Sequence, residues 1–408
     1  MIYRQIFLLF NILHTSRIAE NRSLYSYSHE FRNFLSPLIA QHASPEGKKP
    51  SLVVIGEGGA ISSRREGDEI LPCKEALAFL IQNVPEALIG LFHRIRPSTA
   101  FEQPMVLSSD ATTERIEGFA NKLRKIAHGT KQNVLALIGA HAAPKYAAAV
   151  AEALCADDMN IRCKGSDQIS GQRSVLLACA RNTPYEYPSD AQNTVNDAVM
   201  LSAMPEMRGR AGLLFHGKVF ALPGLQRKGE PIEFDSRFPT IAHRDEQSED
   251  WYFSETSPAH FPHGECGEKF LLDSGIQRFD IRGDEQESIL AAIHASASKG
   301  KLSGMVLQTA ARSGGHLRED NVDILSQLDT LEIPGIVVCD TLHKAGNGTH
   351  ANGQKFEYRH LFDGRGLLSE EVQILLARWV AQAKSVGIND KEALVDFVRQ
   401  KLSAHSGT

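Results

Sequence analysis

Short, continuous apolar runs alternate along the chain with longer stretches in which apolar residues recur every three to four positions. In the first half, the apolar runs are residues 51–56, 104–109, 133–139 and 174–180, and the periodic stretches that follow them are residues 74–84, 113–127, 144–154 and 190–204. Such runs bounded by Gly or Ser are typical of buried strands, and a period of 3.6 residues is typical of helices. The alternation predicts βαβ units around a mostly parallel sheet. Residues 211–222 add a predicted hairpin that turns near Gly217.

A polar segment without a sustained period interrupts this alternation. It covers residues 243–268, contains two prolines, and is interpreted as a linker between domains. A second α/β block follows, with apolar runs at 276–281, 304–309 and 335–340 and periodic stretches at 287–300, 321–331, 369–385 and 390–402. The predicted division is an N-terminal extension at 1–50, a larger domain at 51–242, the linker at 243–268 and a smaller domain at 269–408.

The N-terminus and the cysteines bear on the compartment. An apolar run at 6–13 follows Arg4, as in a signal peptide, but it is too short to span a bilayer and no small-residue cleavage site follows. The 6 cysteines are scattered and form no CxxC pair, which is typical of reduced thiols in a long chain. We therefore expect a cytoplasmic protein, with secretion through an N-terminal signal as the alternative.

The net charge and the short motifs indicate which classes of partner, cofactor and metal to expect. The 44 basic and 49 acidic residues leave a net charge of −5, without blocks of like charge, which argues against nucleic-acid and membrane partners and favours a small-molecule or protein partner. The sequence has no G-x-S-x-G, no P-loop and no H-E-x-x-H, and "GEGGAI" lacks the third glycine of a dinucleotide fingerprint. "HFPHGEC" at 260–266 has no fourth zinc ligand nearby. We expect no cofactor and no metal.

The order of several short motifs resembles the bacterial-type L-asparaginase/glutaminase family from about Ser51 to near the C-terminus. "EGGAIS" at 57–62 is similar to the family's T-G-G-T-I-A, and "IGAHAAPKYAAAVAEAL" at 138–154 is similar to its H-G-T-D-T strand end and helix. Further matches in the same order are "ACARN" at 178–182, "YPSDAQNTVNDAV" at 187–199, "RGRAGLLF" at 208–215, "GMVLQTAARSGGHL" at 304–317 and "IPGIVVCD" at 333–340. The resemblance implies a two-domain asparaginase-like α/β fold and a homodimer or homotetramer.

The resemblance also implies site residues, and here the sequence departs from the family. Family members use a threonine nucleophile, a loop tyrosine, and a second threonine with an aspartate and a lysine as proton relay. The matching positions are Ala60 for the first threonine, Ala140 for the second and His141 for the aspartate, while Lys228 in "LQRKGEP" stands nearest the lysine. No tyrosine occurs from Gly59 to Pro85. His141 and Lys228 are thus the candidate catalytic residues.

The resemblance also implies candidate ligand-binding residues on the loops after strand ends, where open parallel sheets bind ligands. Ser108 matches the serine of the family's G-S-Q-D-M segment that helps to hold the substrate's α-carboxylate, and Asp110 matches that segment's aspartate. The candidate ligand-binding residues are Gly59, Ala60, Ser108, Ser109, Asp110, Gly139, Ala140 and His141. Each has a purely structural alternative. Gly58 and Gly59 suit a tight turn, Ser108 suits a helix cap, His141 suits a hydrogen-bonded non-catalytic role, and Lys228 suits an exposed loop.

Two hypotheses for function follow. In the first, the chain is asparaginase-like but lacks L-asparagine and L-glutamine hydrolysis, and binds a small amino-acid-like ligand in the old pocket. In the second, it is a diverged amidohydrolase with a rearranged nucleophile such as Ser62 or Ser108. The missing threonines, aspartate and tyrosine favour the first, because catalytic groups that act as a unit lose activity together.

Overall fold

The computed structural model describes residues 49–66, 69–99, 111–129, 132–155, 173–222, 224–229, 231–245, 247–254, 269–281, 285–309, 319–339, 358–364 and 367–406. Several sequence predictions lie outside these ranges. They are most of the N-terminal extension, the strand at 104–109, the second half of the linker and the motif at 310–317.

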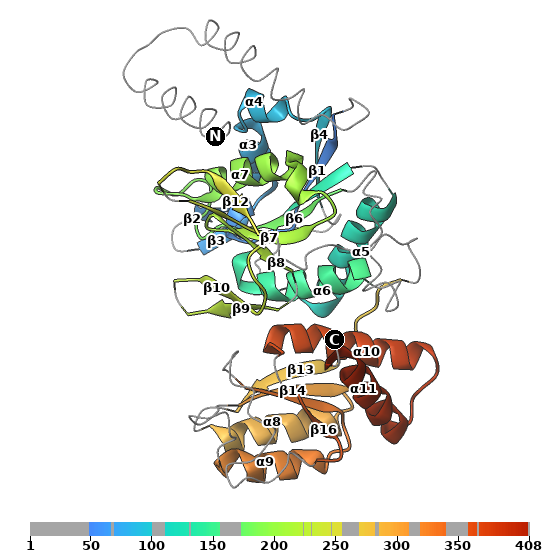
Figure 1. Cartoon of the computed structure of the whole chain (residues 1–408). Helices are drawn as coiled ribbons and strands as arrows, with labels where there is room; N and C mark the ends of the chain where they lie inside the picture. The colour runs from blue at the N-terminus through green and yellow to red at the C-terminus, as the bar shows by residue number, and fades with distance from the viewer. Residues whose placement is uncertain are drawn as a thin grey trace, which may run out of the picture.

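An eight-stranded sheet in the order β12-β11-β8-β7-β6-β5-β1-β4 forms the larger unit (Figure 1). Its strands are β1 (Ser51–Gly56), β4 (Arg94–Thr99), β5 (Gln132–Leu137), β6 (Val175–Ala178), β7 (Ala211–Phe215), β8 (Lys218–Ala221), β11 (Ala242–Arg244) and β12 (Trp251–Phe253). The run from β4 through β1, β5 and β6 to β7 is parallel, and β8, β11 and β12 continue it in antiparallel pairs. The α/β fold with a large, mostly parallel sheet is thereby confirmed.

Helices cover both faces of this sheet, because its strands are apolar on both sides. Leu52 and Val54 of β1 are fully buried against the layer of α3 (Lys74–Gln82), α4 (Glu86–Ile89) and α7 (Ala191–Ala203). Val53 and Ile55 pack on the opposite face against α5 (Thr113–Gly129) and α6 (Ala143–Cys155). The short hairpins β2–β3 (Ser63–Glu66, Glu69–Pro72) and β9–β10 (Leu225–Lys228, Glu233–Ser236) and the 3₁₀ turn η4 (Pro205–Met207) complete this unit.

Strand β4 is absent from the sequence prediction for a physical reason. Among the described strands it pairs only with β1, at one edge of the sheet, and its side chains Arg94, Arg96 and Pro97 are exposed. Edge strands tolerate charges and proline because one side of their backbone needs no partner. The resulting polar sequence lacks the continuous apolar run by which the other strands were recognised.

The structure corrects the start of the predicted linker. Strands β11 and β12 lie within residues 242–253 and extend the large sheet from β8. Both are three residues long, and only Ala242 and Trp251 at their ends are buried. Such short strands give no readable period, so the sequence resembled a linker. Residues 243–254 therefore belong to the larger unit.

The smaller unit is a four-stranded parallel sheet in the order β13-β14-β15-β16. Its strands are β13 (Ile276–Asp280), β14 (Gly304–Thr309), β15 (Gly335–Cys339) and β16 (Leu361–Asp363), and its helices are α8 (Gln286–Ser298), α9 (Glu319–Asp329), α10 (Ser369–Ser385) and α11 (Lys391–Ser406). Figure 1 shows α8 and α9 on one face of this sheet, while α10 lies on the other face, next to α6 of the larger unit.

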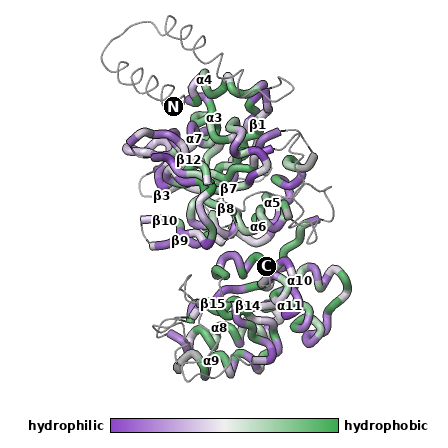
Figure 2. The backbone as a smooth tube through the Cα atoms, viewed as in Figure 1, coloured by the Kyte–Doolittle hydropathy of each residue, from purple (hydrophilic) through white to green (hydrophobic). Residues whose placement is uncertain are grey.

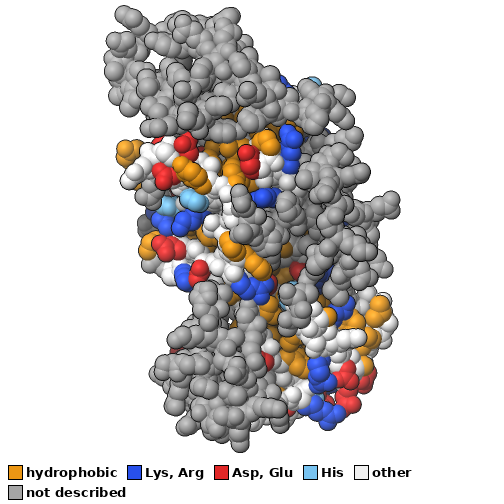
Figure 3. Space-filling view, viewed as in Figure 1, with side chains coloured by type: hydrophobic (Ala, Val, Ile, Leu, Met, Phe, Trp, Pro, Cys, Tyr) orange, Lys and Arg blue, Asp and Glu red, His pale blue; other side chains and the backbone are white. Residues whose placement is uncertain are grey.

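Helix α10 is buried nearly all round, as expected for a helix between two layers. Leu376 and Val380 belong to a hydrophobic core that is continuous with α5 and α6. In Figure 2 hydrophobic segments gather in the centre of the molecule and polar ones lie at its margins. On the face drawn in Figure 3, the acidic and basic side chains of the described residues are interspersed. The contact is also polar, since Arg378 of α10 pairs with Glu152 of α6, and Arg237 donates to Glu371 at 2.9 Å.

Stability is expected to fall as pH rises from about 5 to 8, because burial raises the pKa of Glu371 to about 7. Arg237 opposes this shift and Glu152 adds to it. Between its ordinary pKa and about 7, the folded state binds more protons at Glu371 than the unfolded state, so the free energy of unfolding decreases with pH by on the order of 1–3 kcal/mol. Asp197, whose pKa burial raises to about 6, contributes in the same direction.

Chemical denaturation at pH 5, 6, 7 and 8 would measure this dependence. We expect Glu371→Gln to flatten it without abolishing the Asp197 contribution. The matched control is Glu392→Gln, since Glu392 pairs with Arg359 where both side chains are 67% exposed. An unchanged slope in Glu371→Gln would show that Glu371 is ionised in the folded protein at these pH values.

Candidate functional site

The carboxyl ends of β1 and β5 lie side by side and end in the same local structure. The two strands pair in parallel register up to Gly56 and Leu137, and the amide of Glu57 donates to the carbonyl of Leu137 at 2.9 Å. Beyond these points, β1 leads into the 3₁₀ turn η1 (Ala60–Ser62) and β5 leads into the 3₁₀ turn η3 (Ala140–Ala142). Adjacent strand ends of this kind form the edge where ligands bind in parallel sheets.

The glycines of this edge are required by the backbone. Gly58 and Gly59 have φ values of 132° and 78°, which side-chain-bearing residues rarely adopt. A Cβ atom on Gly59 would lie 2.0 Å from Cα of Gly139, so the two loops touch backbone to backbone. The tight-turn interpretation thus accounts for both residues, and the ligand-facing interpretation of Gly59 stays a prediction.

The two turns carry methyl groups where the resemblance places hydroxyls. Ala60 is half-buried and Ala140 is 2% exposed. The hydroxyls that follow Ala60 face the protein interior, because Ser62 and Ser63 are both fully buried. Ser63 donates to the carbonyl of Gly59 at 2.6 Å. Burial of Ser62 counts against its use as a rearranged nucleophile.

The structure gathers some of the candidate residues and separates others. Gly59, Ala60, Gly139, Ala140 and His141 lie on the two touching loops, and His141 is exposed. The candidate residues Ser108, Ser109 and Asp110 lie outside the described residues.

Lys228 lies on the β9–β10 hairpin, which packs near α6 and α10. It pairs there with Asp235 at 2.6 Å, and its side chain is 57% exposed. Lys228 is therefore an exposed, ion-paired lysine at the end of strand β9. Its role as a catalytic residue stays a prediction.

A buried polar cluster at the same edge was missed by the sequence analysis. Glu57 is 2% exposed, and its Oε1 accepts hydrogen bonds from Arg115 Nε at 2.6 Å and from the Tyr146 hydroxyl at 2.8 Å. Arg115 also donates to the backbone carbonyl of Glu57 at 3.3 Å. The cluster ties α5 and α6 to the end of β1, so it holds the Gly-Gly turn in place.

Burial and hydrogen bonding have opposite effects on the pKa of Glu57. Burial raises the pKa of Glu57, whereas the hydrogen bonds from Arg115 and Tyr146 favour its charged form. Burial and the neighbouring Glu57 charge together raise the pKa of Tyr146, so the phenol stays protonated and donates. The available sequence signal was a single acidic residue directly after five buried strand positions.

The loop after β6 is held by a carboxylate that the resemblance had also matched. Asp190 accepts hydrogen bonds from the backbone amides of Arg181 and Asn182, each at 3.0 Å. Arg181 in turn donates to the carbonyl of Ile232 at 3.1 Å. These contacts give the "ACARN" and "YPSDAQ" motifs a structural role in positioning α7.

The described residues contain neither a cluster of metal ligands nor a membrane span. No group of three or more His, Cys, Asp and Glu residues that could hold a metal occurs in the part of the chain that the structure describes. The residues of the "HFPHGEC" motif fall outside it. No helix among the described residues is long and apolar enough to cross a membrane.

Comparison with known proteins gives structural matches without sequence matches. No protein-family model matches the chain, and no curated protein matches it in sequence. Its structure is similar to the probable cytoplasmic L-asparaginase from Campylobacter jejuni, with a TM-score of 0.62 and 16% identity over 86% of this chain and 99% of that one. It is also similar to the thermostable L-asparaginase from Thermococcus kodakarensis, with a TM-score of 0.57 and 14% identity over 85% and 96% of the two chains. The chain therefore has an asparaginase-like fold.

Proposed function

We propose that this chain is an asparaginase-like protein that lacks ordinary L-asparagine and L-glutamine hydrolysis and binds a small amino-acid-like ligand on the loops after β1 and β5. The observation that carries the proposal is the pair of turns η1 and η3, which begin with Ala60 and Ala140 on two loops in direct contact. The scaffold of a strand-end site is present there, and the hydroxyl groups are absent from its two key positions.

Amide hydrolysis by this route needs a hydroxyl nucleophile and a base that removes its proton. Alanine supplies neither. His141 is exposed on η3 and supplies an imidazole, which can donate and accept hydrogen bonds and so suits recognition of a charged or polar ligand. We further propose that the protein is cytoplasmic, on the evidence of its scattered cysteines. A homodimer or homotetramer is what the resemblance implies, and light scattering would measure it.

The alternative, a diverged amidohydrolase with a rearranged nucleophile, is weakened by the burial of Ser62. Ser108 remains available to this alternative. Any hydrolysis that disappears in Ser108→Ala and persists in His141→Ala would favour it over the binding function.

Purified protein is expected to show negligible release of ammonia from L-asparagine and L-glutamine, because Ala60 and Ala140 have no hydroxyl. The triple variant Ala60→Thr, Ala140→Thr, His141→Asp should gain trace hydrolysis at most, since the loop tyrosine is missing and Lys228 is paired with Asp235. Wild-type turnover on the order of 10 per second would contradict the proposal. Near-normal turnover of the triple variant would show that the catalytic pocket is otherwise intact.

Ligand-dependent melting with a panel of amino acids and amides tests the binding function. A ligand present at a hundred times its dissociation constant stabilises the folded state by about 2.7 kcal/mol. We expect the shift to be lost in His141→Ala. Absence of a shift with every member of the panel would leave the scaffold without a ligand of this class and would overturn the proposal.

A further inference from the structure

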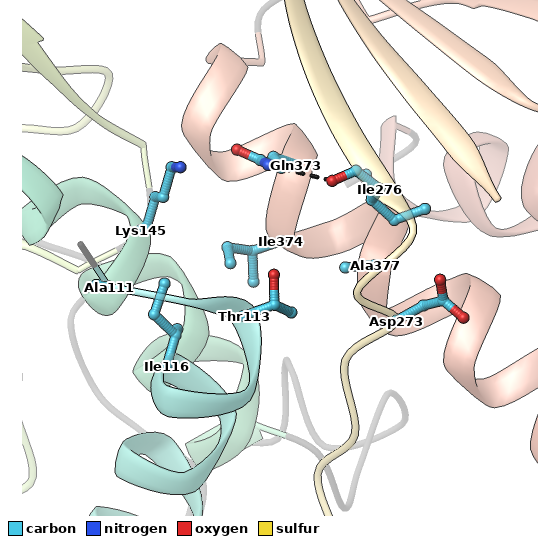
Figure 4. A pocket seen from close by; sticks show the side chains of 9 residues that line it. All are labelled: Ala111, Thr113, Ile116, Lys145, Asp273, Ile276, Gln373, Ile374 and Ala377. Carbon is cyan, nitrogen blue, oxygen red and sulfur yellow. Dashed lines mark hydrogen bonds between the residues drawn. The ribbon is translucent and has the colours of Figure 1, made fainter. Parts of the chain in front are cut away.

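A shallow hollow lies between the two units, at the amino-terminal ends of α5 and α6. The hollow is small: its cavity volume is about 30 Å³, and about 300 Å³ is reached only when open solvent is included. Thr113 and Lys145 line it from the larger unit, and Ile276, Gln373 and Ile374 line it from the smaller one (Figure 4). Its floor is apolar, and its polar groups stand apart from one another around the floor. This is the usual composition of a small-molecule site.

Three polar groups of the described residues line this hollow. Figure 4 shows the Lys145 ammonium, the Thr113 hydroxyl and the Gln373 side-chain carbonyl turned toward the space in front of Ile374. The Gln373 amide nitrogen donates to the carbonyl of Ile276 at 3.4 Å, while its Oε1 is buried without a hydrogen-bond partner. Buried polar atoms are normally satisfied, so the unpaired Oε1 of Gln373, on a wall of the hollow that Lys145 also lines, indicates a missing partner.

The charge of the hollow is positive. Asp273 also lines it, but both of its oxygens are engaged, by Lys384 at 2.5 Å and by the amide of Gly275 at 2.9 Å. Arg278 nearby is paired with Glu370 at 2.6 Å. Burial lowers the pKa of Lys145, Arg278 lowers it further, and Glu370 partly offsets both effects. An anion beside Lys145 would relieve the cost of keeping its charge in this position.

We propose that this hollow is a binding site for a small α-hydroxycarboxylate. The carboxylate accepts from Lys145 and from the Thr113 hydroxyl, and the ligand's own hydroxyl donates to Oε1 of Gln373. Because its residues come from both units, a bound ligand would bridge α5 and α6 to α10. This inference is independent of the function proposed for the loops after β1 and β5, since the two sets of residues do not overlap.

Isothermal titration calorimetry with sodium glycolate, sodium acetate and inorganic phosphate tests the proposal. We expect glycolate to bind wild-type protein most tightly, and acetate to bind at least about fivefold more weakly because it cannot donate to Gln373. Lys145→Met should weaken glycolate at least about tenfold, since it removes a charge-assisted hydrogen bond. The matched control is Lys125→Met, at an exposed lysine of α5 outside the hollow.

Two further measurements test the charge of Lys145 and the independence of this hollow from the loops after β1 and β5. Without ligand, Lys145→Met should melt at or above the wild-type temperature, because a desolvated charge is removed. His141→Ala should leave glycolate binding unchanged, which distinguishes this site from the one at the ends of β1 and β5. The proposal is overturned if none of the three anions binds at about 20 millimolar, which is the practical limit of such a titration for weak ligands. It is also overturned if Lys145→Met binds glycolate as wild type does. Equal affinity for acetate and glycolate would overturn the role of Gln373.

Discussion

Replacing Gly59 with alanine is expected to lower the free energy of unfolding by about 3–5 kcal/mol, the sum of backbone strain and overpacking. The strain arises because Gly59 has a φ of 78°. The overpacking arises because the new methyl carbon would lie 2.0 Å from Cα and 2.6 Å from the amide nitrogen of Gly139. These neighbours are backbone atoms at the end of a buried strand, so relief requires the two loops to move apart.

The matched control is Gly300→Ala. Gly300 has a φ of 63°, and a Cβ atom there would meet no heavy atom within 4 Å. This variant therefore carries the conformational cost alone, about 1–2 kcal/mol. Urea denaturation of the two variants and of wild type gives the comparison. Equal destabilisation by the two substitutions would mean that the loops after β1 and β5 are not in contact in solution.

Replacing Arg115 with methionine is expected to cost about 3–5 kcal/mol, the usual effect of removing one partner of a buried ion pair. Glu57 would keep only the Tyr146 hydroxyl on Oε1, and its second oxygen already lacks a hydrogen bond. Since burial already raises the pKa of Glu57, loss of Arg115 should raise it further. The variant should therefore lose stability more steeply as pH rises above the ordinary pKa of a glutamate, because an unpaired Glu57 would ionise in the unfolded chain before it does in the folded one.

A double-mutant cycle isolates this pair. Glu57→Gln combined with Arg115→Met should be less damaging than the sum of the two single changes, because neither variant group then bears a charge. Arg359→Met is the exposed control, since Arg359 and Glu392 are each 67% exposed, and it should cost less than about 1 kcal/mol. Additive single effects would show that Glu57 and Arg115 do not interact in the folded protein.

Much of the fold could be predicted from the sequence because its strands are buried on both faces. β1, β5, β6 and β14 are continuous apolar runs, and each precedes or follows a stretch of helical period. The elements that escaped prediction are short or lie at an edge, such as β4, β11, β12 and β16. These strands are either polar, as β4 is, or only three residues long, so none forms an apolar run long enough to be recognised in the sequence.

The candidate site was less predictable. The motif at 57–62 and the turn at 140–142 could be placed at one sheet edge because parallel strands deliver their carboxyl ends together. The partners of Glu57 could not be identified, because Arg115 and Tyr146 are 58 and 89 residues away along the chain. Lys228 was placed by resemblance alone, and its ion pair with Asp235 depends on the register of a hairpin that no periodicity specifies.

Helix α10 has a consequence for how the chain acquires its structure. The α5–α6 face of the large sheet packs against residues 369–385, which are synthesised after the whole of the larger unit. Until that segment emerges from the ribosome, the larger unit has an apolar face open to water and to other chains. Domains usually complete folding as their own residues emerge from the ribosome. In this protein the core of the larger unit would be completed only when α10 of the smaller unit packs against it. We therefore expect nascent chains that stop before residue 369 to aggregate or to recruit chaperones, and the two units of the finished protein to unfold in a single cooperative transition.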